Sequence, residues 1–299
     1  MDHSAPIRAF LNENHIAWSE EASGRECTTF RVGGPIALFA EPDTFEKACS
    51  LLSFVRDNGV PFYLIGNGSN LLIRDHGLDK LVIRLAGELS EYRLENDRLI
   101  CGAGASLVAA SRYSVLSGWT GLEWATGIPG SVGGAVAMNA GAYGGEIKNV
   151  LKRVKAFSNG ELLDIEVDPD SMGYRISPFA FPKMTVLEAE FELVPDDGSA
   201  KLRMDELTLK RREKQPLNYP SAGSTFKRPK GNFAGALIEN AGLKGLTVGG
   251  AQVSEKHAGF LINTGEATAD DVLGLIAEVQ RIVFEKYGVM LEPEVKILD

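Results

Sequence analysis

Apolar residues recur at helical and strand-like intervals along the first part of the chain. Their spacing predicts a helix at 5–13, a strand at 36–40, a helix between Asp43 and Gly59, and a strand at 61–65. Asp43 is placed to cap the second helix with Glu46 completing a capping box, and Gly59 is placed to end it. We therefore expect a compact, right-handed, parallel strand–helix–strand unit.

The middle of the chain is richer in strands. Six stretches have the short apolar pattern of strands, at 71–75, 81–85, 98–104, 149–157, 161–167 and 184–194. A single helix at 106–117 interrupts them, and Gly118 follows it. The turn 158–160 (SNG) joins two of the strands. This pattern is typical of an α+β fold.

The last hundred residues begin a new arrangement near Pro195. The pattern predicts a helix at 201–214, a short helix at 235–242, strands at 251–254 and 259–263, a long helix between Thr268 and Gly288, and a final strand at 289–298. We therefore place a domain boundary at 195–200, with residues 1–195 in one domain and residues 196–299 in the other.

The composition agrees with a protein that buries substantial cores. The chain has 299 residues, of which 44% are hydrophobic and 24% charged, and this length suggests two domains. No apolar run reaches the roughly 18 residues of a membrane span. The N-terminal stretch is polar and lacks the apolar core of a signal peptide, so we expect a cytoplasmic protein. Three scattered cysteines and four scattered histidines indicate neither disulfides nor a metal site.

Charge is distributed unevenly. A net charge of −9 argues against general nucleic-acid binding. The segment 200–230 nevertheless holds nine basic residues and only three acidic ones. It is either a solvated helix face followed by a basic loop, or a site for a small molecule that bears phosphate or carboxylate groups.

A first glycine-rich loop, GNGSN at 66–70, directly follows the strand at 61–65. A Rossmann motif needs a third glycine, where this chain has Leu71, and then a helix, where this chain has another strand. No Gly-Lys-Ser/Thr follows, which excludes a P-loop. The loop is therefore either a plain tight turn or a nest of free N–H groups suited to a pyrophosphate.

A second glycine-rich stretch, GIPGSVGGAVAMNAGAYGG at 127–145, contains seven glycines and four alanines. Such a stretch lets the main chain approach a ligand closely. Alternatively, it is a tightly packed, turn-rich part of the core. With the first loop, it would suit a large dinucleotide lying across both.

Three motifs resemble the FAD-binding domain of the vanillyl-alcohol-oxidase (PCMH) type: TTFRVGG at 28–34, GNGSNLL at 66–72 and GLEWATGIPGSVGGAVAMNAGAYG at 121–144. The stretches YRISPF at 174–179, AGSTFKRP at 222–229 and LEPEV at 291–295 narrow the resemblance to the UDP-N-acetylenolpyruvoylglucosamine reductase family. The match runs in order from about Thr28 to Leu298. It implies non-covalent FAD, NADPH as hydride donor, and reduction of an enolpyruvyl ether in peptidoglycan precursor synthesis.

The resemblance also assigns domains and cofactor contacts. It implies an FAD-binding domain at 1–195, with a small strand–helix–strand subdomain at about 30–75, and a substrate-binding domain at 196–299 whose last strand contributes to the active site. The implied FAD-binding residues are Arg31, Gly33, Gly66, Asn67, Gly68, Ser69, Asn70, Leu71, Gly127, Gly130, Ser131, Gly133, Gly134, Asn139, Gly141 and Ala142.

Three further residues carry the chemistry by resemblance. Arg175 binds the substrate carboxylate and stabilises the negative charge that develops on it, because a guanidinium can donate two hydrogen bonds to a carboxylate. Ser224 donates the proton, with Thr225 as a neighbouring alternative. Glu294 stabilises or orients the enolate. Glu292 would share its strand face in a regular strand, so the choice of Glu294 rests on the family pattern.

The same resemblance places Lys214 near the polar part of the substrate. Lys227 is close to Ser224 in the sequence and could stabilise its alkoxide, and Tyr219 is a candidate lid residue over the UDP group. Only 49 residues separate Arg175 from Ser224, which leaves no room for the tyrosine-bearing insertion of some family members. The chain therefore looks like the shorter family type. We expect no metal, nucleic-acid, membrane or obligatory protein partner.

Two other functions remain open at this point. A flavin oxidase on the same fold often attaches FAD covalently through His or Cys, but the first glycine loop has neither. The other candidate is a non-catalytic nucleotide-binding protein. The presence of Arg175, Ser224 and Glu294 together argues against it.

Overall fold

The computed structural model describes residues 4–299, and its contacts divide the chain into two compact units. The first unit contains the residues up to Glu20, Leu38–Asn67 and Lys80–Leu209. The second contains Glu21–Ala37, Gly68–Asp79 and Lys210–Asp299. A single cut at 195–200 does not describe these units. Phe30, Val32 and Leu72 are buried in one core with residues of the last eighty positions, and such long-range burial has no local signal in the sequence.

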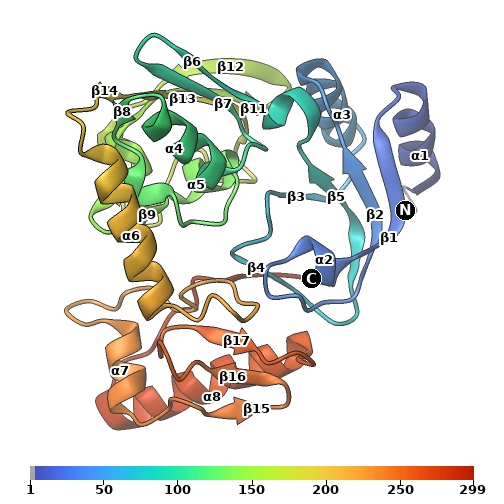
Figure 1. Ribbon diagram of the computed structural model, residues 1–299. Helices are drawn as coiled ribbons and strands as arrows, with labels where there is room; N and C mark the ends of the chain where they lie inside the picture. The colour runs from blue at the N-terminus through green and yellow to red at the C-terminus, as the bar shows by residue number, and fades with distance from the viewer. Residues whose placement is uncertain (1–3) are drawn as a thin grey trace. The chain divides into compact units, whose positions relative to one another are not determined.

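A five-stranded antiparallel sheet organises the first unit. Its strands, in spatial order, are β12 (Glu161–Glu166), β11 (Leu151–Ser158), β13 (Thr185–Glu192), β7 (Arg98–Gly102) and β6 (Tyr92–Glu95). The turn between β11 and β12 places Asn159 and Gly160 at φ of 52° and 92°, as a tight hairpin requires. Helices α4 (Leu107–Leu116) and α5 (Val132–Met138) pack on this sheet (Figure 1).

A four-stranded sheet has the order β1 (Ala17–Ser23), β2 (Pro35–Glu41), β5 (Leu78–Arg84) and β3 (Phe62–Ile65). The predicted strand–helix–strand unit is β2, α3 (Phe45–Asp57) and β3, but β5 lies between its two strands and pairs with β3 in parallel. Thr44, not Asp43, caps α3, because Thr44 has extended φ/ψ and accepts from the Lys47 N–H at 3.1 Å. Asp43 instead pairs with the Lys47 ammonium at 2.8 Å.

Shorter elements complete the first unit. They are α1 (Ser4–Glu13), η1 (Gly87–Ser90), β8 (Trp119–Thr120), η2 (Glu123–Ala125), β9 (Gly141–Ala142), β10 (Gly145–Glu146), η3 (Ile147–Asn149), η4 (Pro169–Ser171) and β14 (Val194–Pro195). Helix α6 (Ala200–Lys214) follows. The helices predicted at 5–13, 106–117 and 201–214 are thus confirmed within one residue at each end.

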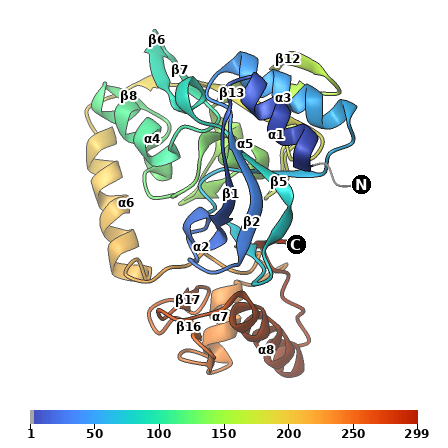
Figure 2. The same cartoon turned by 90° about the vertical axis from the view of Figure 1, so that its right-hand side faces the viewer.

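The second unit is built on a small antiparallel sheet of β15 (Thr247–Val248), β16 (Ala251–Val253) and β17 (Leu261–Asn263). Helix α8 (Ala269–Tyr287) lies along it and contacts α7 (Ala234–Asn240) (Figure 2). As predicted, α8 begins after Thr268, which forms a capping box with Asp271, and ends at Gly288 with φ of 66°. The unit also contains α2 (Gly24–Cys27) and β4 (Leu71–Ile73).

The predicted final strand is wrong over most of its length. Only β18 (Lys296–Leu298) is a strand, and it pairs in parallel with β4. Pro293 has no N–H to give a ladder, and residues 292–294 instead make single hydrogen bonds to residues 225–227. Within residues 4–299, no helix is both long and apolar enough to cross a membrane. The mixed helices and strands confirm the α+β class.

Candidate functional site

The two glycine-rich stretches meet in the first unit. The Nδ2 of Asn67 donates to the carbonyl oxygen of Pro129 at 3.3 Å. A Cβ on Gly66 would lie 2.1 Å from the Oγ of Ser131, so a larger residue there would displace the Ser131 hydroxyl. The fold therefore joins two stretches that are about sixty residues apart in the sequence, as a ligand spanning both would require.

Part of the second stretch is a helix rather than an open loop. Ser131 caps α5, with its Oγ accepting from the N–H of Gly134 at 3.3 Å. The N–H groups of Val132 and Gly133 donate to Ala105 and Ala103 at 2.8 and 2.7 Å. These N–H groups fasten the stretch to the neighbouring chain. We therefore do not expect the N–H groups of Val132 and Gly133 to contact a cofactor.

The glycines of this stretch have two different roles: some make room for neighbouring protein atoms, and others leave main chain exposed. A Cβ on Gly133 would lie 2.8 Å from that of Ala103, and one on Gly145 would lie 2.3 Å from the Trp124 ring. These two positions make room for the protein's own atoms. Gly134 is exposed, and outside its own helix backbone and its chain neighbours only the Ser131 hydroxyl, at 3.2 Å, comes within 4 Å of where a Cβ would lie. Gly134 therefore leaves bare main chain at the surface, which fits the close approach of a flat dinucleotide such as FAD.

Asn139 ends α5 in the left-handed conformation, with φ of 43° and 1% of its surface exposed. Its Nδ2 donates to the Glu146 carboxylate at 3.0 Å and to the Gly173 carbonyl at 2.9 Å. Its Oδ1 accepts from the N–H of Lys148 at 3.0 Å. The side chain is thus occupied by protein groups, and a contact between Asn139 and FAD is left to its main chain.

Arg175 lies in a tight turn. The N–H groups of Gly173 and Ile176 each donate to the other's carbonyl at 3.0 Å, and Arg175 occupies the third position with φ of 57°. A type II turn normally has glycine there, because a Cβ is crowded at positive φ. The half-buried Arg175 guanidinium lies 5.1 Å from the centre of the exposed Tyr174 ring. The main chain at Arg175 is therefore strained, and strain of this kind clusters at functional sites.

In the second unit, three of the motifs lie together. The N–H of Thr29 donates to Gly68 at 3.2 Å, and its hydroxyl donates to the carbonyl of Ser221 at 2.7 Å. Gly68 has φ of 64°, and a Cβ there would lie 1.9 Å from the Cys27 carbonyl. Arg31, also at positive φ, presents an exposed side chain beside this contact. Thr29 was not among the residues expected from the sequence.

Ser224 and Glu294 lie on adjacent stretches of chain in the second unit. The N–H of Glu294 donates to the carbonyl of Thr225 at 2.7 Å, and the N–H of Lys227 donates to Glu292 at 2.9 Å. The Nδ2 of Asn70, in the first glycine loop, donates to the Glu294 carbonyl at 3.0 Å. These hydrogen bonds hold Asn70, a predicted cofactor residue, against Glu294, and they hold Glu294 beside Thr225, the chain neighbour of Ser224.

The structure separates each predicted residue from its neighbouring alternative. Thr225 is fully buried and its hydroxyl accepts from the N–H of Leu261 at 3.2 Å, whereas Ser224 is exposed. The carboxylate of Glu292 is 69% exposed and pairs with the Lys227 ammonium, whereas Glu294 is half-buried. Ser224 and Glu294 are therefore better placed for chemistry than Thr225 and Glu292.

Two of the predicted substrate residues, Lys214 and Tyr219, lie on exposed surface. Lys214 is the last residue of α6, and Tyr219, in the loop after it, is 49% exposed.

His257, which the sequence did not single out, lies edge-on to Phe260, the bridge partner of Ser224. Burial lowers the pKa of His257, and its Nδ1 accepts from the N–H of Gly259 at 3.1 Å. It therefore supports the segment beside Ser224 as a neutral acceptor.

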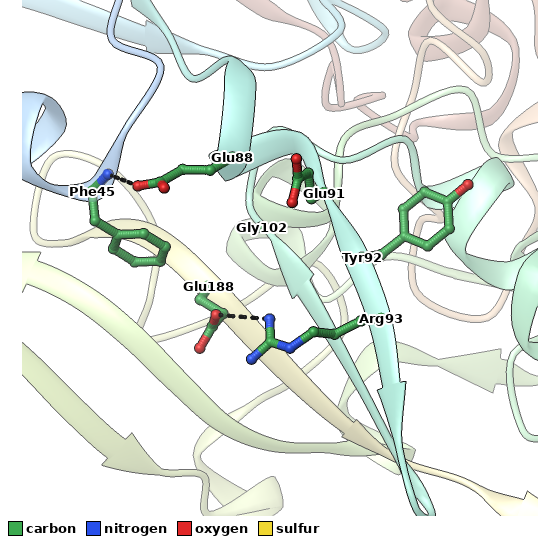
Figure 3. Close-up of a pocket in the computed structure, with 7 residues that line it drawn as sticks. All are labelled: Phe45, Glu88, Glu91, Tyr92, Arg93, Gly102 and Glu188. Carbon is green, nitrogen blue, oxygen red and sulfur yellow. Dashed lines mark hydrogen bonds and ion pairs between the residues drawn. The ribbon is translucent and has the colours of Figure 1, made fainter.

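A hollow of about 210 Å³ lies elsewhere in the first unit (Figure 3). Its lining is largely acidic and aromatic, and consists of Phe45, Glu88, Glu91, Tyr92, Arg93, Gly102 and Glu188. The Glu88 carboxylate accepts from the N–H of Phe45, and Arg93 lies 3.8 Å from Glu188. None of the predicted site residues lines this hollow, so it is distinct from the candidate site.

Comparison with known proteins gives a consistent result. Residues 36–166 match an FAD binding domain, and residues 215–298 match the C-terminal domain of UDP-N-acetylenolpyruvoylglucosamine reductase. The reductase of that name from Clostridium botulinum strain Hall is 48% identical over 91% of this chain and 89% of its own length. The one from Caldanaerobacter subterraneus subsp. tengcongensis is 45% identical over 98% and 96%.

A solved structure agrees with these relatives. The crystal structure of UDP-N-acetylenolpyruvylglucosamine reductase from Thermus caldophilus is similar with a TM-score of 0.81 and 35% identity. The similarity covers 95% of this chain and 99% of that chain.

Proposed function

Because the chain belongs to the UDP-N-acetylenolpyruvoylglucosamine reductase family, we propose that Arg175, Ser224 and Glu294 perform the substrate chemistry of this reductase. As a family member, the chain is an FAD-dependent oxidoreductase. It uses NADPH to reduce UDP-N-acetylglucosamine enolpyruvate to UDP-N-acetylmuramate in peptidoglycan precursor synthesis. FAD, when bound and reduced, supplies a hydride to the methylene carbon of the enolpyruvyl group.

Hydride addition leaves negative charge on the adjacent carbon, delocalised into the carboxylate. We assign the binding of this carboxylate to Arg175, because a guanidinium donates two parallel hydrogen bonds to a carboxylate and strengthens them as charge accumulates. The observation that supports this role is the position of Arg175 at the third residue of a tight turn, where φ is 57°. Main-chain strain of this kind concentrates at functional sites.

A proton must then reach the carbon that carries the charge. We assign this step to Ser224, because it presents an exposed hydroxyl whereas that of Thr225 is buried and bonded. Glu294 orients the reacting carboxylate or the donor. The observation that carries both assignments is the 2.7 Å hydrogen bond from the Glu294 N–H to Thr225, which fixes the two stretches side by side.

The remaining assignments follow from charge and exposure. The basic segment 200–230 has the sign needed to bind the diphosphate of the UDP group, and Lys214 and Tyr219 are exposed on it. Lys227 takes part in substrate binding when its ammonium exchanges the Glu292 carboxylate for the substrate. We propose residues 1–195 and 196–299 as the cofactor and substrate parts of the sequence, a functional division that differs from the division into compact units. We also propose a cytoplasmic enzyme without an obligatory protein partner.

The bare main chain at Gly134 and the meeting of the two glycine-rich stretches support the proposed FAD-binding residues. The members of this group in the first unit are Gly66, Asn67, Gly127, Gly130, Ser131, Gly133, Gly134, Asn139, Gly141 and Ala142. Arg31, Gly33 and Gly68–Leu71 belong to it in the second unit. At Gly33, Gly66, Gly68, Gly133 and Gly141 a Cβ would lie under 3.0 Å from the protein's own atoms, and the Asn139 side chain is bonded within the protein, so we limit the role of these residues in FAD binding to main-chain contact.

An anaerobic two-step experiment tests the function. NADPH is added to the FAD-loaded protein until the long-wavelength flavin absorbance is bleached, and UDP-N-acetylglucosamine enolpyruvate is then added. We expect the absorbance to return as the substrate is reduced. A bleached flavin that this substrate leaves unchanged would exclude the reductase activity. Release of FAD by acid would separate the reductase from an oxidase with covalent flavin.

A further inference from the structure

The Asn139 side chain links the glycine-rich stretch to the turn that carries Arg175. One Nδ2 bond reaches the carbonyl of Gly173, the first residue of the turn, at 2.9 Å. The other bonds of the side chain, to Glu146 and to the N–H of Lys148, fix the amide in that orientation. With 1% of its surface exposed, Asn139 has no freedom to release the turn without breaking buried hydrogen bonds.

A second contact holds the same turn. The ammonium of Lys148 donates to the carbonyl of Met172 at 3.3 Å, and Met172 is buried. Lys148 is itself held by Asn139 through its N–H. Two consecutive carbonyls, those of Met172 and Gly173, are therefore anchored by one cluster centred on Asn139.

The turn needs an external anchor because of its third residue. Arg175 has φ of 57°, a conformation that arginine adopts at a cost and that glycine or asparagine adopts more easily. Hydrogen bonds between Gly173 and Ile176 close the turn, but they do not fix it to the rest of the unit. The bond from Asn139 supplies that fixed point.

We propose that Asn139 is a positioning residue for Arg175, which holds the guanidinium in place for the substrate anion through the carbonyl of Gly173. The inference rests on the proposed role of Arg175 in the reductase. It assigns to Asn139 a task other than contact with FAD, and it makes the end of α5 part of the substrate site.

The test uses Asn139→Gly on the FAD-loaded enzyme. Glycine tolerates φ of 43°, so this change removes the side chain without straining the helix end. Asn159→Gly is the matched control, because Asn159 is an exposed asparagine at φ of 52° in the β11–β12 turn of the same unit. If Asn139→Gly does not fold, Asn139→Asp combined with Glu146→Gln serves instead, since the pair removes the donor to Gly173, keeps an acceptor for Lys148 and avoids two carboxylates in contact.

The first readout does not depend on activity. Trypsin cleaves after arginine, and cleavage after Arg175 requires the turn to open. We expect the initial rate of this cut, followed by mass spectrometry, to rise about tenfold in Asn139→Gly and to stay unchanged in Asn159→Gly. An unchanged rate after Arg175 in Asn139→Gly would overturn the positioning role.

The second readout is the return of flavin absorbance on adding UDP-N-acetylglucosamine enolpyruvate. We expect it to slow by about 10²-fold in Asn139→Gly, with NADPH bleaching preserved, because a small misplacement of a binding group has effects of that size. In an Arg175→Ala background, Asn139→Gly should change the rate by less than about twofold, since the two residues act as one unit.

The outcomes separate the two hypotheses. If the wild-type flavin is not reoxidised by this substrate, the proposed function fails, and the trypsin experiment still decides whether Asn139 holds the turn. If the wild type works and the effects of Asn139→Gly and Arg175→Ala on reoxidation multiply, Asn139 does not act through Arg175. Loss of FAD from Asn139→Gly, with the turn still resistant to trypsin, would also overturn the proposal.

Discussion

The N–H of Glu294 donates to the carbonyl oxygen of Thr225 over 2.7 Å, next to Ser224. The bond joins two stretches that are about seventy residues apart, and the Nδ2 of Asn70 fixes the other side of Glu294 through its carbonyl. Both bonds are made by the main chain of Glu294, so its side chain can be changed without removing either one. The catalytic assignments can therefore be tested by substitution.

Replacing Ser224 with alanine removes the proposed proton donor and little else, because the side chain is exposed. We expect Ser224→Ala to leave the bleaching of FAD by NADPH intact and to slow reoxidation by substrate by about 10²-fold or more. Stopped-flow absorbance measures both steps. Ser117→Ala, at an exposed serine just after α4, is the control. Equal slowing of both steps would mean that Ser224 is structural.

Glu294 and Glu292 form a natural matched pair. We expect Glu294→Gln to slow reoxidation by about 10²-fold, because the carboxyl group proposed to orient the reacting groups is lost. Glu292→Gln should change the rate by no more than about threefold, since an exposed ion pair such as that with Lys227 contributes little. Equal effects of the two substitutions on the reoxidation rate would contradict the assignment of Glu294.

Two of the proposed FAD-binding glycines, Gly66 and Gly134, differ in how closely the protein's own atoms surround them. A Cβ on Gly66 would lie 2.1 Å from the Ser131 Oγ, so we expect Gly66→Ala to lower the free energy of unfolding by about 1–3 kcal/mol. Gly134→Ala adds a Cβ to exposed main chain and should change the stability of the apoprotein little, because the helix preference of alanine offsets the tight 3.2 Å contact with the Ser131 hydroxyl, while FAD binding is weakened. Urea unfolding of the apoprotein and flavin titration measure the two effects. Unchanged FAD affinity in Gly134→Ala would remove Gly134 from the cofactor site.

The buried carboxylate of Glu123 should make stability depend on pH. Burial by itself would raise the pKa of Glu123, but hydrogen bonds from Thr120, Gly121 and Arg203 outweigh this and lower the pKa below its ordinary value of 4.5. The stabilisation is therefore fully present above about pH 4.5 and is lost as the pH falls through the lower pKa of the folded state. We expect Glu123→Gln to reduce the free energy of unfolding by about 1–3 kcal/mol at pH 7.

Urea unfolding at a series of pH values checks this expectation. The difference between the wild type and Glu123→Gln should shrink as the pH falls below 4.5, because the wild-type carboxylate then becomes protonated. Glu161→Gln, at an exposed position at the start of β12, is the control and should show no such trend. A difference that stays constant from pH 7 to pH 3.5 would show that ionisation of Glu123 does not stabilise the fold.

Local signals in the sequence predicted most elements correctly. Thr268 and Gly288 bound α8 as expected, because a capping side chain and a left-handed glycine act within one turn of a helix. The hairpin at Asn159 and Gly160 follows from the same kind of local chemistry. Where two residues competed for one local role, as Asp43 and Thr44 did, the main-chain geometry selected Thr44.

The family, the α+β class and the residue types available for chemistry could all be predicted from the sequence, because motifs, periodicity and turn residues are local properties of the chain. Which of these residues meet could be seen only in the folded chain. Gly66 reaches Ser131, Asn139 reaches Gly173, and Glu294 reaches Thr225 through contacts that span dozens to about seventy positions. Such contacts form because buried N–H and C=O groups must find partners and apolar cores must close, and no local pattern specifies where that happens.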